Sequence, residues 1–106
     1  MPRAKFQTLT EQMFYILLCL RTERCGIDIM DMVPALTRGH VTVGSGTLYN
    51  LLEQFQSEDL IRPTRVEGRR RSYILTERGR RLLEEEYERI CRRAEDYRRI
   101  MEEEST

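Results

Sequence analysis

Apolar side chains in the last quarter of the chain recur at alternating intervals of four and three residues. This heptad spacing places one stripe of a helix against a second helix. It predicts a helix from Thr76, whose hydroxyl can cap the first turn, to about Glu104. At 1.5 Å per residue, roughly 28 residues span about 42 Å, longer than a small domain. Part of the apolar stripe must therefore pack against another chain or remain exposed to solvent. The residues of this seam, expected at a dimer interface, are Leu83, Tyr87, Ile90, Ala94, Tyr97 and Met101.

Charged residues surround the seam. Three Glu/Arg pairs lie four residues apart in the favourable order, and each is expected to contribute ~0.3 kcal/mol. The acidic run at residues 84–86 is interpreted as a solvated helix face and not as a metal site. The three expected pairs are Glu85 with Arg89, Glu88 with Arg92, and Glu95 with Arg99.

Two shorter helices are predicted in the first third of the chain. The first should run from Thr8 or Thr10 to about Arg21, with apolar residues on more than one face, which indicates contact with its own domain and with a partner. A second helix should follow a turn over residues 21–26, and Pro34 should bend or end it. The expected apolar stripe of this second helix consists of Ile27, Met30, Val33 and Leu36.

A third helix is predicted from about residues 45–47 to Glu58, after a glycine-containing loop in which His40 is interpreted as a solvated surface side chain. By the 100° wheel, Asn50 and Glu53 point directly outward. Thr47, Tyr49 and Gln54 lie on the flanks. The core stripe, at i, i+3, i+4 and i+7, consists of Leu48, Leu51, Leu52 and Phe55.

Two extended runs at residues 61–66 and 72–75 predict a β-hairpin. Gly68 can supply the positive φ that its tip requires, and Pro63 limits the first strand to an edge position or its beginning. Three consecutive arginines, at residues 69–71, should then lie on the tip and the second strand.

The formal net charge is zero, with 18 basic and 18 acidic residues, which by itself speaks against phosphate binding. The charge is unevenly distributed, however. Residues 62–81 carry eight Arg and two Glu, a net +6, while residues 1–61 carry −2 and residues 82–106 carry −4. Lys5 is the only lysine, and all other basic residues are Arg. This abundance of Arg is equally compatible with phosphate binding and with a compositional bias of the genome. The position of the arginines in the fold therefore has to decide between the two.

Three helices followed by a hairpin with a basic tip is the order of a winged helix-turn-helix, in which the third helix enters the DNA major groove. The predicted fold class is mainly α (α+β), with a two-stranded wing and a long C-terminal dimerisation helix. The DNA-binding unit should span residues 1–76 and the dimerisation helix residues 77–106, as one compact unit. The candidate DNA-contacting residues combine amide and hydroxyl groups, which can bind base edges, with arginines, which can bind phosphates. They are Ser45, Thr47, Tyr49, Asn50, Gln54, Arg65, Arg69, Arg70 and Arg71.

Two sequence elements stand out, Gly-Thr-Leu-Tyr at residues 46–49 and Arg-Ser-Tyr-Ile-Leu-Thr-Glu-Arg-Gly at residues 71–79. At this separation they resemble the PadR-like family of bacterial transcriptional regulators. The resemblance covers residues 8–101 and implies a homodimeric repressor of the short subgroup, in which Ser45, Thr47, Tyr49 and the wing arginines lie at or near DNA.

The sequence departs from the family pattern in the third helix, which is expected to read the DNA bases, and at positions that concern the binding of a small-molecule effector. Asn50 stands where the family commonly has Pro, which adds a possible base reader. Cys25 and Ile27 stand where aromatic residues are often found. The chain has no Trp, which some relatives use in a drug-binding pore, so a small-molecule effector is unsupported.

Other functions have weaker support. No nucleophile is paired with a base and no glycine-rich phosphate loop follows a strand, so an enzyme is not expected, nor is a cofactor or a metal. A protein-interaction module without DNA binding is the main alternative, but it would show apolar anchors on the third helix. Cys19 and Cys91 are interpreted as buried structural residues, and Cys25 as the only thiol whose surroundings suit reactivity. The odd cysteine count and the short apolar runs predict a cytoplasmic protein without a membrane span.

Overall fold

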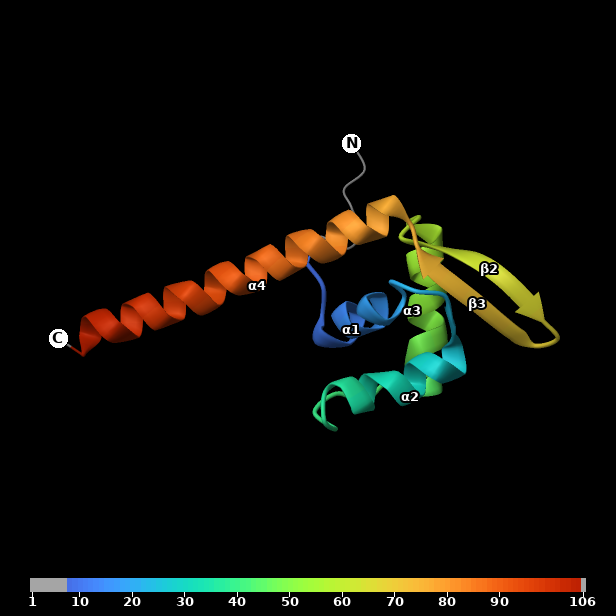
Figure 1. Ribbon diagram of the computed structural model, residues 1–106, viewed down its shortest axis with the longest axis horizontal. Helices are drawn as coiled ribbons and strands as arrows, with labels where there is room; N and C mark the ends of the chain where they lie inside the picture. Colours follow the sequence, from blue (N-terminus) through green and yellow to red (C-terminus); the bar gives the residue numbers. More distant parts are fainter. Residues whose placement is uncertain (1–7, 106) are drawn as a thin grey trace.

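The computed structural model describes residues 8–105, in which a small body of helices and a twisted hairpin carries one long helix that extends away from it (Figure 1). The principal extents are 62 × 39 × 21 Å. The predicted winged helix-turn-helix with a long C-terminal helix is therefore confirmed. In chain order, the elements are α1 (Glu11–Cys19), β1 (Arg24–Cys25), α2 (Gly26–Leu36), α3 (Ser45–Ser57), β2 (Ile61–Glu67), β3 (Arg70–Leu75) and α4 (Glu77–Glu104).

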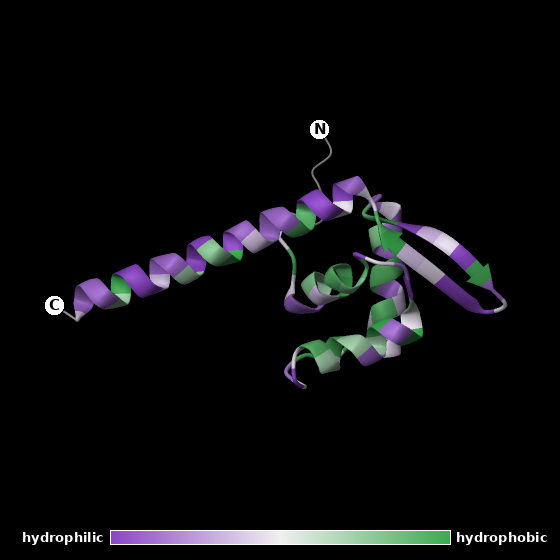
Figure 2. Cartoon of the chain, viewed as in Figure 1, coloured by the Kyte–Doolittle hydropathy of each residue, from purple (hydrophilic) through white to green (hydrophobic). Residues whose placement is uncertain are grey.

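The core lies where α1, α2 and α3 meet the base of the hairpin. All four residues of the predicted α3 stripe are buried, and α1 contributes side chains from more than one face. In Figure 2 the apolar colouring concentrates on these elements, whereas α4 is mostly polar beyond its base. The largest fully buried side chains are those of Phe55, Ile16, Leu17, Leu20, Ile29, Leu48, Leu52, Ile61 and Val33.

The predicted stripe of α2 was only partly right. Val33 is buried, but its partner one turn earlier is Ile29, whereas Ile27 is 47% and Leu36 53% exposed. Pro34 does not end the helix, which continues to Leu36. The last turn is closed by the Thr37 hydroxyl, which donates to the Val33 carbonyl at 2.8 Å.

The segment predicted as a turn at residues 21–26 contains a short strand, β1. It pairs antiparallel with β3, so that the sheet has three strands in the order β1-β3-β2. β2 lies at an edge, as Pro63 requires, and the register shifts between Pro63 and Arg65. A two-residue turn at residues 68–69 closes the hairpin, and Gly68 adopts the expected positive φ of 62°.

The start of α4 is locked onto the connection between α3 and β2. The Thr76 hydroxyl accepts from the Gly79 backbone N–H at 3.0 Å and donates to the Asp59 carbonyl at 2.6 Å. The Thr76 backbone N–H donates to the Leu60 carbonyl at 3.0 Å. A Cβ atom on Gly79 would lie 2.1 Å from that same Leu60 oxygen, so the glycine permits this close approach.

The acidic run at the base of α4 is not wholly solvated, contrary to the prediction. Glu86 is only 5% exposed because its carboxylate accepts from the Leu9 backbone N–H at 3.3 Å and pairs with Arg89. This carboxylate therefore ties the entry to α1 onto α4, and it occupies Arg89, which had been expected to pair with Glu85.

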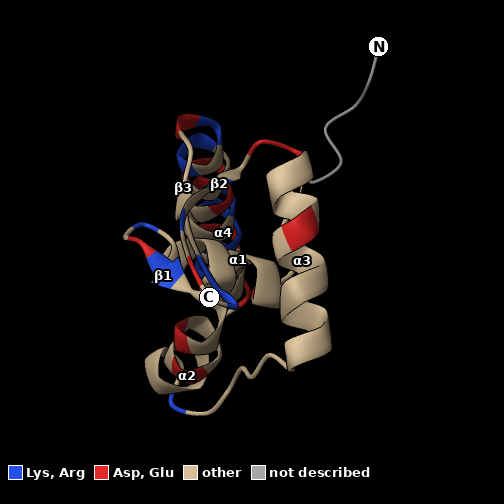
Figure 3. Cartoon of the chain, turned by 90° about the vertical axis from the view of Figure 1, so that its right-hand side faces the viewer, with Lys and Arg blue, Asp and Glu red and all other residues tan. Residues whose placement is uncertain are grey.

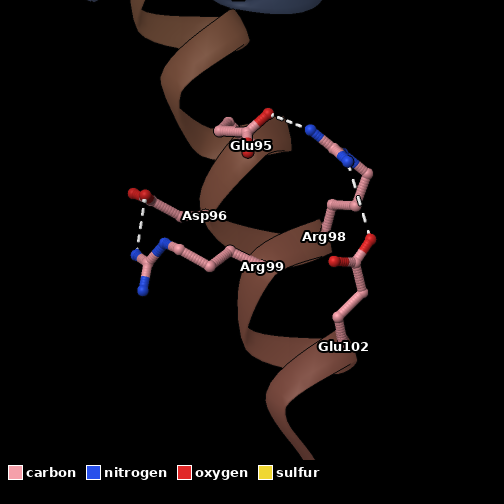
Figure 4. A network of polar contacts seen from close by, with 5 residues as sticks. All are labelled: Glu95, Asp96, Arg98, Arg99 and Glu102. Carbon is pink, nitrogen blue, oxygen red and sulfur yellow. Dashed lines mark hydrogen bonds and ion pairs between the residues drawn. The ribbon is translucent and has the colours of Figure 1, made fainter. Parts of the chain in front are cut away.

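Farther along α4, the ion pairs also differ from the expected set. Arg98 contacts Glu95 at 2.5 Å and Glu102 at 3.5 Å, while Arg99 contacts Asp96 at 3.2 Å instead of Glu95 (Figure 4). All of these side chains are more than half exposed, so each pair contributes little to stability.

Among residues 8–105, none of the helices combines the length and the apolar composition that a membrane span requires.

Candidate nucleic-acid interface

The outer face of α3 carries the predicted polar side chains. Ser45, Thr47, Tyr49 and Asn50 are exposed, because the buried stripe holds the opposite side of the helix against the core. Gln54 is half-buried, so less of it is available than expected. The backbone N–H groups at the start of α3 have no side-chain cap, which leaves them available to an anion.

A groove of about 350 Å³ lies between α3, the start of α2 and the hairpin. We call it the α3–wing groove, the wing being residues 61–75. It brings Tyr49 of α3 together with the three wing arginines at residues 69–71, which are distant in sequence. Figure 3 views the molecule from the side on which the wing projects, with α3 standing beside it. The groove is lined by Cys25, Gly26, Ile27, Tyr49, Glu53, Gln56, Arg69, Arg70, Arg71 and Tyr73.

Tyr49 is positioned by the start of α2. A Cβ atom on Gly26 would lie 2.7 Å from the Tyr49 hydroxyl oxygen, so only glycine allows the ring to lie across this helix end. Tyr73, from β3, is 7% exposed and also lines the groove. Tyr49 therefore faces the wing side of α3, whereas Thr47 and Gln54 lie on the other flank.

The wing supplies the positive charge. Residues 61–75 contain five Arg and one Glu, a net +4. Arg65 contacts Glu67 at 3.6 Å, and because both side chains are more than 60% exposed this pair is weak. The arginines at 69–71 are exposed, and within residues 8–105 no ion pair engages them. Their guanidinium groups are therefore free for phosphate oxygens.

Six residues that line the groove were missing from the predicted set, among them Glu53, Gln56 and Ile27. Glu53 had been placed on the outer face of α3 by the helical wheel, but a carboxylate is not an obvious partner for DNA. Gln56 lies beside Tyr49 on the same flank and could have been found by the same wheel. Ile27 had been assigned to the core, but it is exposed in the structure.

The seam divides into two parts. Leu83 is only 9% exposed and belongs to the core of its own chain. Beyond it the apolar side chains are exposed, and a second groove of about 270 Å³, lined in part by Phe14, Leu18, Leu83 and Tyr87, joins the seam to α1. The large apolar side chains exposed on α4 are Tyr87 (59%), Ile90 (42%), Tyr97 (68%), Ile100 (45%) and Met101 (45%).

Cys19 is buried, as predicted, but the other two thiols are arranged differently from the prediction. Cys25 is 7% exposed, whereas Cys91 on α4 is exposed. Burial raises the pKa of the Cys19 thiol, and the nearby positive charges of Arg24 and Arg21 oppose this only in part. Among the described residues, no group of three or more His, Cys, Asp or Glu side chains could hold a metal ion.

The sequence model of the transcriptional regulator PadR-like family matches residues 16–85, which run from the end of α1 through α2, α3 and the wing to the base of α4. The chain belongs to this family. Its members are DNA-binding transcriptional regulators and not enzymes, so the predicted class is confirmed. The matched region ends before most of the exposed seam.

Curated relatives match part of the chain. Transcriptional regulator YqjI of Escherichia coli is 31% identical over 70 residues, which is 66% of this chain and 34% of YqjI. An uncharacterized 37.1 kDa protein in transposon TN4556 of Streptomyces fradiae is 41% identical over 54 residues, which is 51% of this chain and 15% of that protein. The chain thus spans a third or less of the length of these relatives.

Solved structures share the fold at low identity. A transcriptional regulator from Clostridium thermocellum, Cth-833, superposes with a TM-score of 0.64 at 17% identity, covering 88% of this chain and 90% of that one. Pex from Synechococcus superposes with a TM-score of 0.57 at 23% identity, covering 78% of this chain and 84% of Pex. The complex structure of hsRosR-S1 gives 0.66 at 22% identity, covering 92% of both chains.

Proposed function

We propose that this chain is a sequence-specific repressor that binds a pseudo-palindromic operator as a homodimer. The observation that carries the proposal is the α3–wing groove, which joins the polar face of a helix-turn-helix to three arginines that form no ion pair within residues 8–105. Repression is the mode that the family resemblance implies, and an operator within a promoter would exclude the polymerase. Such a protein acts in the bacterial cytoplasm, where the DNA lies.

Base reading is assigned to α3. Its exposed side chains carry hydroxyl and amide groups, and Asn50 lies near the centre of the outer face, where an amide can pair bidentately with adenine. Replacing Asn50 with Ala should relax the preference at one base pair by about 1–3 kcal/mol. A competition titration with single-base variants of the operator measures this.

Phosphate binding is assigned to the start of α3 and to the wing. Ser45 lies in the first turn of α3, beside uncapped N–H groups that favour an anion. The wing arginines at residues 65 and 69–71 then follow the backbone of the duplex beside the reading helix. These contacts fix the register of the protein on DNA and do not themselves select a sequence.

Dimerisation is assigned to the exposed seam. From Tyr87 onward, α4 presents large apolar side chains that are between 42% and 68% exposed in the single chain, and burial of such side chains against a second copy is favourable. The second groove, which lies between α1 and α4, continues this surface toward Leu83 and Phe14. A division near residue 76 into a DNA-binding unit and a dimerisation helix is part of the same proposal, although the first turns of α4 pack in the body.

The test is selection of bound sequences from random duplex DNA, followed by titration at two salt concentrations. The expected result is one enriched motif with two-fold symmetry and half-sites about 10 base pairs apart or a multiple of this. A pool without any enriched motif would refute sequence-specific binding and favour an interaction module. An asymmetric motif bound by one chain would refute the homodimer alone.

A further inference from the structure

The reading helix contains a single charged residue, and it is acidic. α3 has no Lys or Arg, in agreement with the absence of blue from this helix in Figure 3, and Glu53 is its only ionised side chain. Glu53 is exposed and lines the α3–wing groove together with Tyr49 and the wing arginines at residues 69–71. Within residues 8–105, no hydrogen bond or ion pair engages its carboxylate. An unpartnered negative charge therefore lies where the phosphates are expected.

A carboxylate in this position repels phosphates unless it meets a hydrogen-bond donor on a base. In the major groove, the donors are the amino groups of cytosine N4 and adenine N6. Adenine also presents the acceptor N7 beside its amino group, while guanine and thymine present acceptors in the corresponding positions. An ionised carboxylate can only accept, so cytosine is the base that it matches without repulsion.

We propose that Glu53 reads a cytosine in the major groove of each operator half-site. This inference rests on the proposed function and adds the identity of one recognised base. The wing arginines contribute attraction to any sequence, whereas Glu53 penalises every sequence that lacks a donor at its position. It thereby raises selectivity at some cost in overall affinity.

The position of Glu53 relative to Asn50 predicts the spacing of the two bases. Both residues point outward from α3, three residues apart, which corresponds to about 4.5 Å along the helix. Successive base pairs lie about 3.4 Å apart. The cytosine read by Glu53 and the adenine read by Asn50 should therefore lie one or two base pairs apart in the half-site.

A different role for the same carboxylate makes a distinct prediction. Glu53 lines the groove together with Arg70 and Arg71, and it could compete with phosphates for these arginines in the absence of DNA. In that case, removal of its charge would strengthen binding to every sequence by the same factor. The base preference would then be unchanged, which separates this role from base reading.

The experiment compares the wild-type chain with E53Q, E53A and the control E88Q, an exposed carboxylate on α4 outside the seam. Each variant is used in selection from random duplex DNA and then titrated with the selected operator and with versions in which the cytosine is replaced. Wild type and E88Q should select a cytosine one or two base pairs from an adenine and should lose about tenfold or more in affinity when the cytosine is replaced. E53A should lose this discrimination, and E53Q should favour adenine instead.

The inference is overturned if E53A retains the full penalty for replacing the cytosine, or if both variants bind all sequences more tightly by one common factor. It is also overturned if the wild type selects no cytosine. Failure of the proposed function gives a different result, because the wild type would then select no sequence. Circular dichroism of the variants should match that of the wild type, since the side chain is exposed.

Discussion

The wing arginines offer the most quantitative test of DNA binding. We predict that replacing Arg69, Arg70 and Arg71 with Ala weakens binding to every DNA sequence and makes the dependence on salt shallower. The reason is that an arginine that neutralises a phosphate releases a condensed counterion from the duplex. These three side chains are exposed and, within residues 8–105, free of ion pairs, so their whole charge is available to DNA.

The size of the effect follows from the number of contacts. Each phosphate contact contributes a slope of about −0.9 to the plot of log K against log salt concentration. If all three arginines of both wings contact phosphates, the slope changes by about 5.4, and if only one in each wing does so, by about 1.8. Between 50 and 200 mM salt, these limits correspond to about 2,000-fold and about 12-fold differences in how much affinity is lost.

The assay is fluorescence anisotropy of a labelled operator duplex at five or more salt concentrations between 50 and 300 mM. The variant R81A/R92A serves as the control, because it removes exposed arginines from α4, outside the wing and the seam. Its slope should equal that of the wild type. A triple variant with an unchanged slope would refute the assignment of the wing to phosphates, and an equal loss in the control would show a general effect of charge.

Three further predictions concern assembly, stability and the thiols. I90D places a charge in the exposed seam and should give monomers in sedimentation velocity; a variant that remains dimeric would show that the seam is not the interface. G79A should lower the free energy of unfolding in urea by about 1–3 kcal/mol, because its Cβ would overlap a backbone carbonyl. G46A, where nothing lies within 4 Å of the added Cβ, should cost less, and equal losses would contradict the steric argument. Ellman's reagent at pH 8 should modify the exposed Cys91 faster than Cys19, whose burial raises its pKa and so lowers its thiolate fraction; equal rates would contradict this.

The helical elements could be predicted where one clear stripe decides burial. The four apolar residues of α3 form such a stripe, and Thr76 and Thr10 cap the helices as their hydroxyl groups suggested. The stripe of α2 was misassigned because Ile27 and Ile29 both offer helical spacing, and in the structure Ile29 is buried whereas Ile27 is exposed. The strand β1 could not be predicted either, because its two residues are too few to show the alternation of apolar and polar side chains that identifies a strand.

The candidate site was predictable in composition but not in arrangement. The helical wheel identified the outward face of α3, and the basic run identified the wing. That Tyr49 lies across Gly26 and faces the wing depends on contacts between elements that are distant in sequence. The burial of Glu86 has the same origin, because its partner, the Leu9 backbone N–H, leaves no trace in the side-chain pattern.

The separation of charge between α3 and the wing leads to a final expectation. The wing carries +4 and α3 carries −1, so the attraction for phosphates and the selection of bases lie on different elements. Salt weakens the phosphate contacts and acts much less on hydrogen bonds to base edges, and we expect the wing to make the same phosphate contacts in specific and non-specific complexes of this protein. The ratio of specific to non-specific affinity should therefore stay nearly constant between 50 and 200 mM salt while both affinities fall. A ratio that collapses with salt would show that specificity resides in the wing.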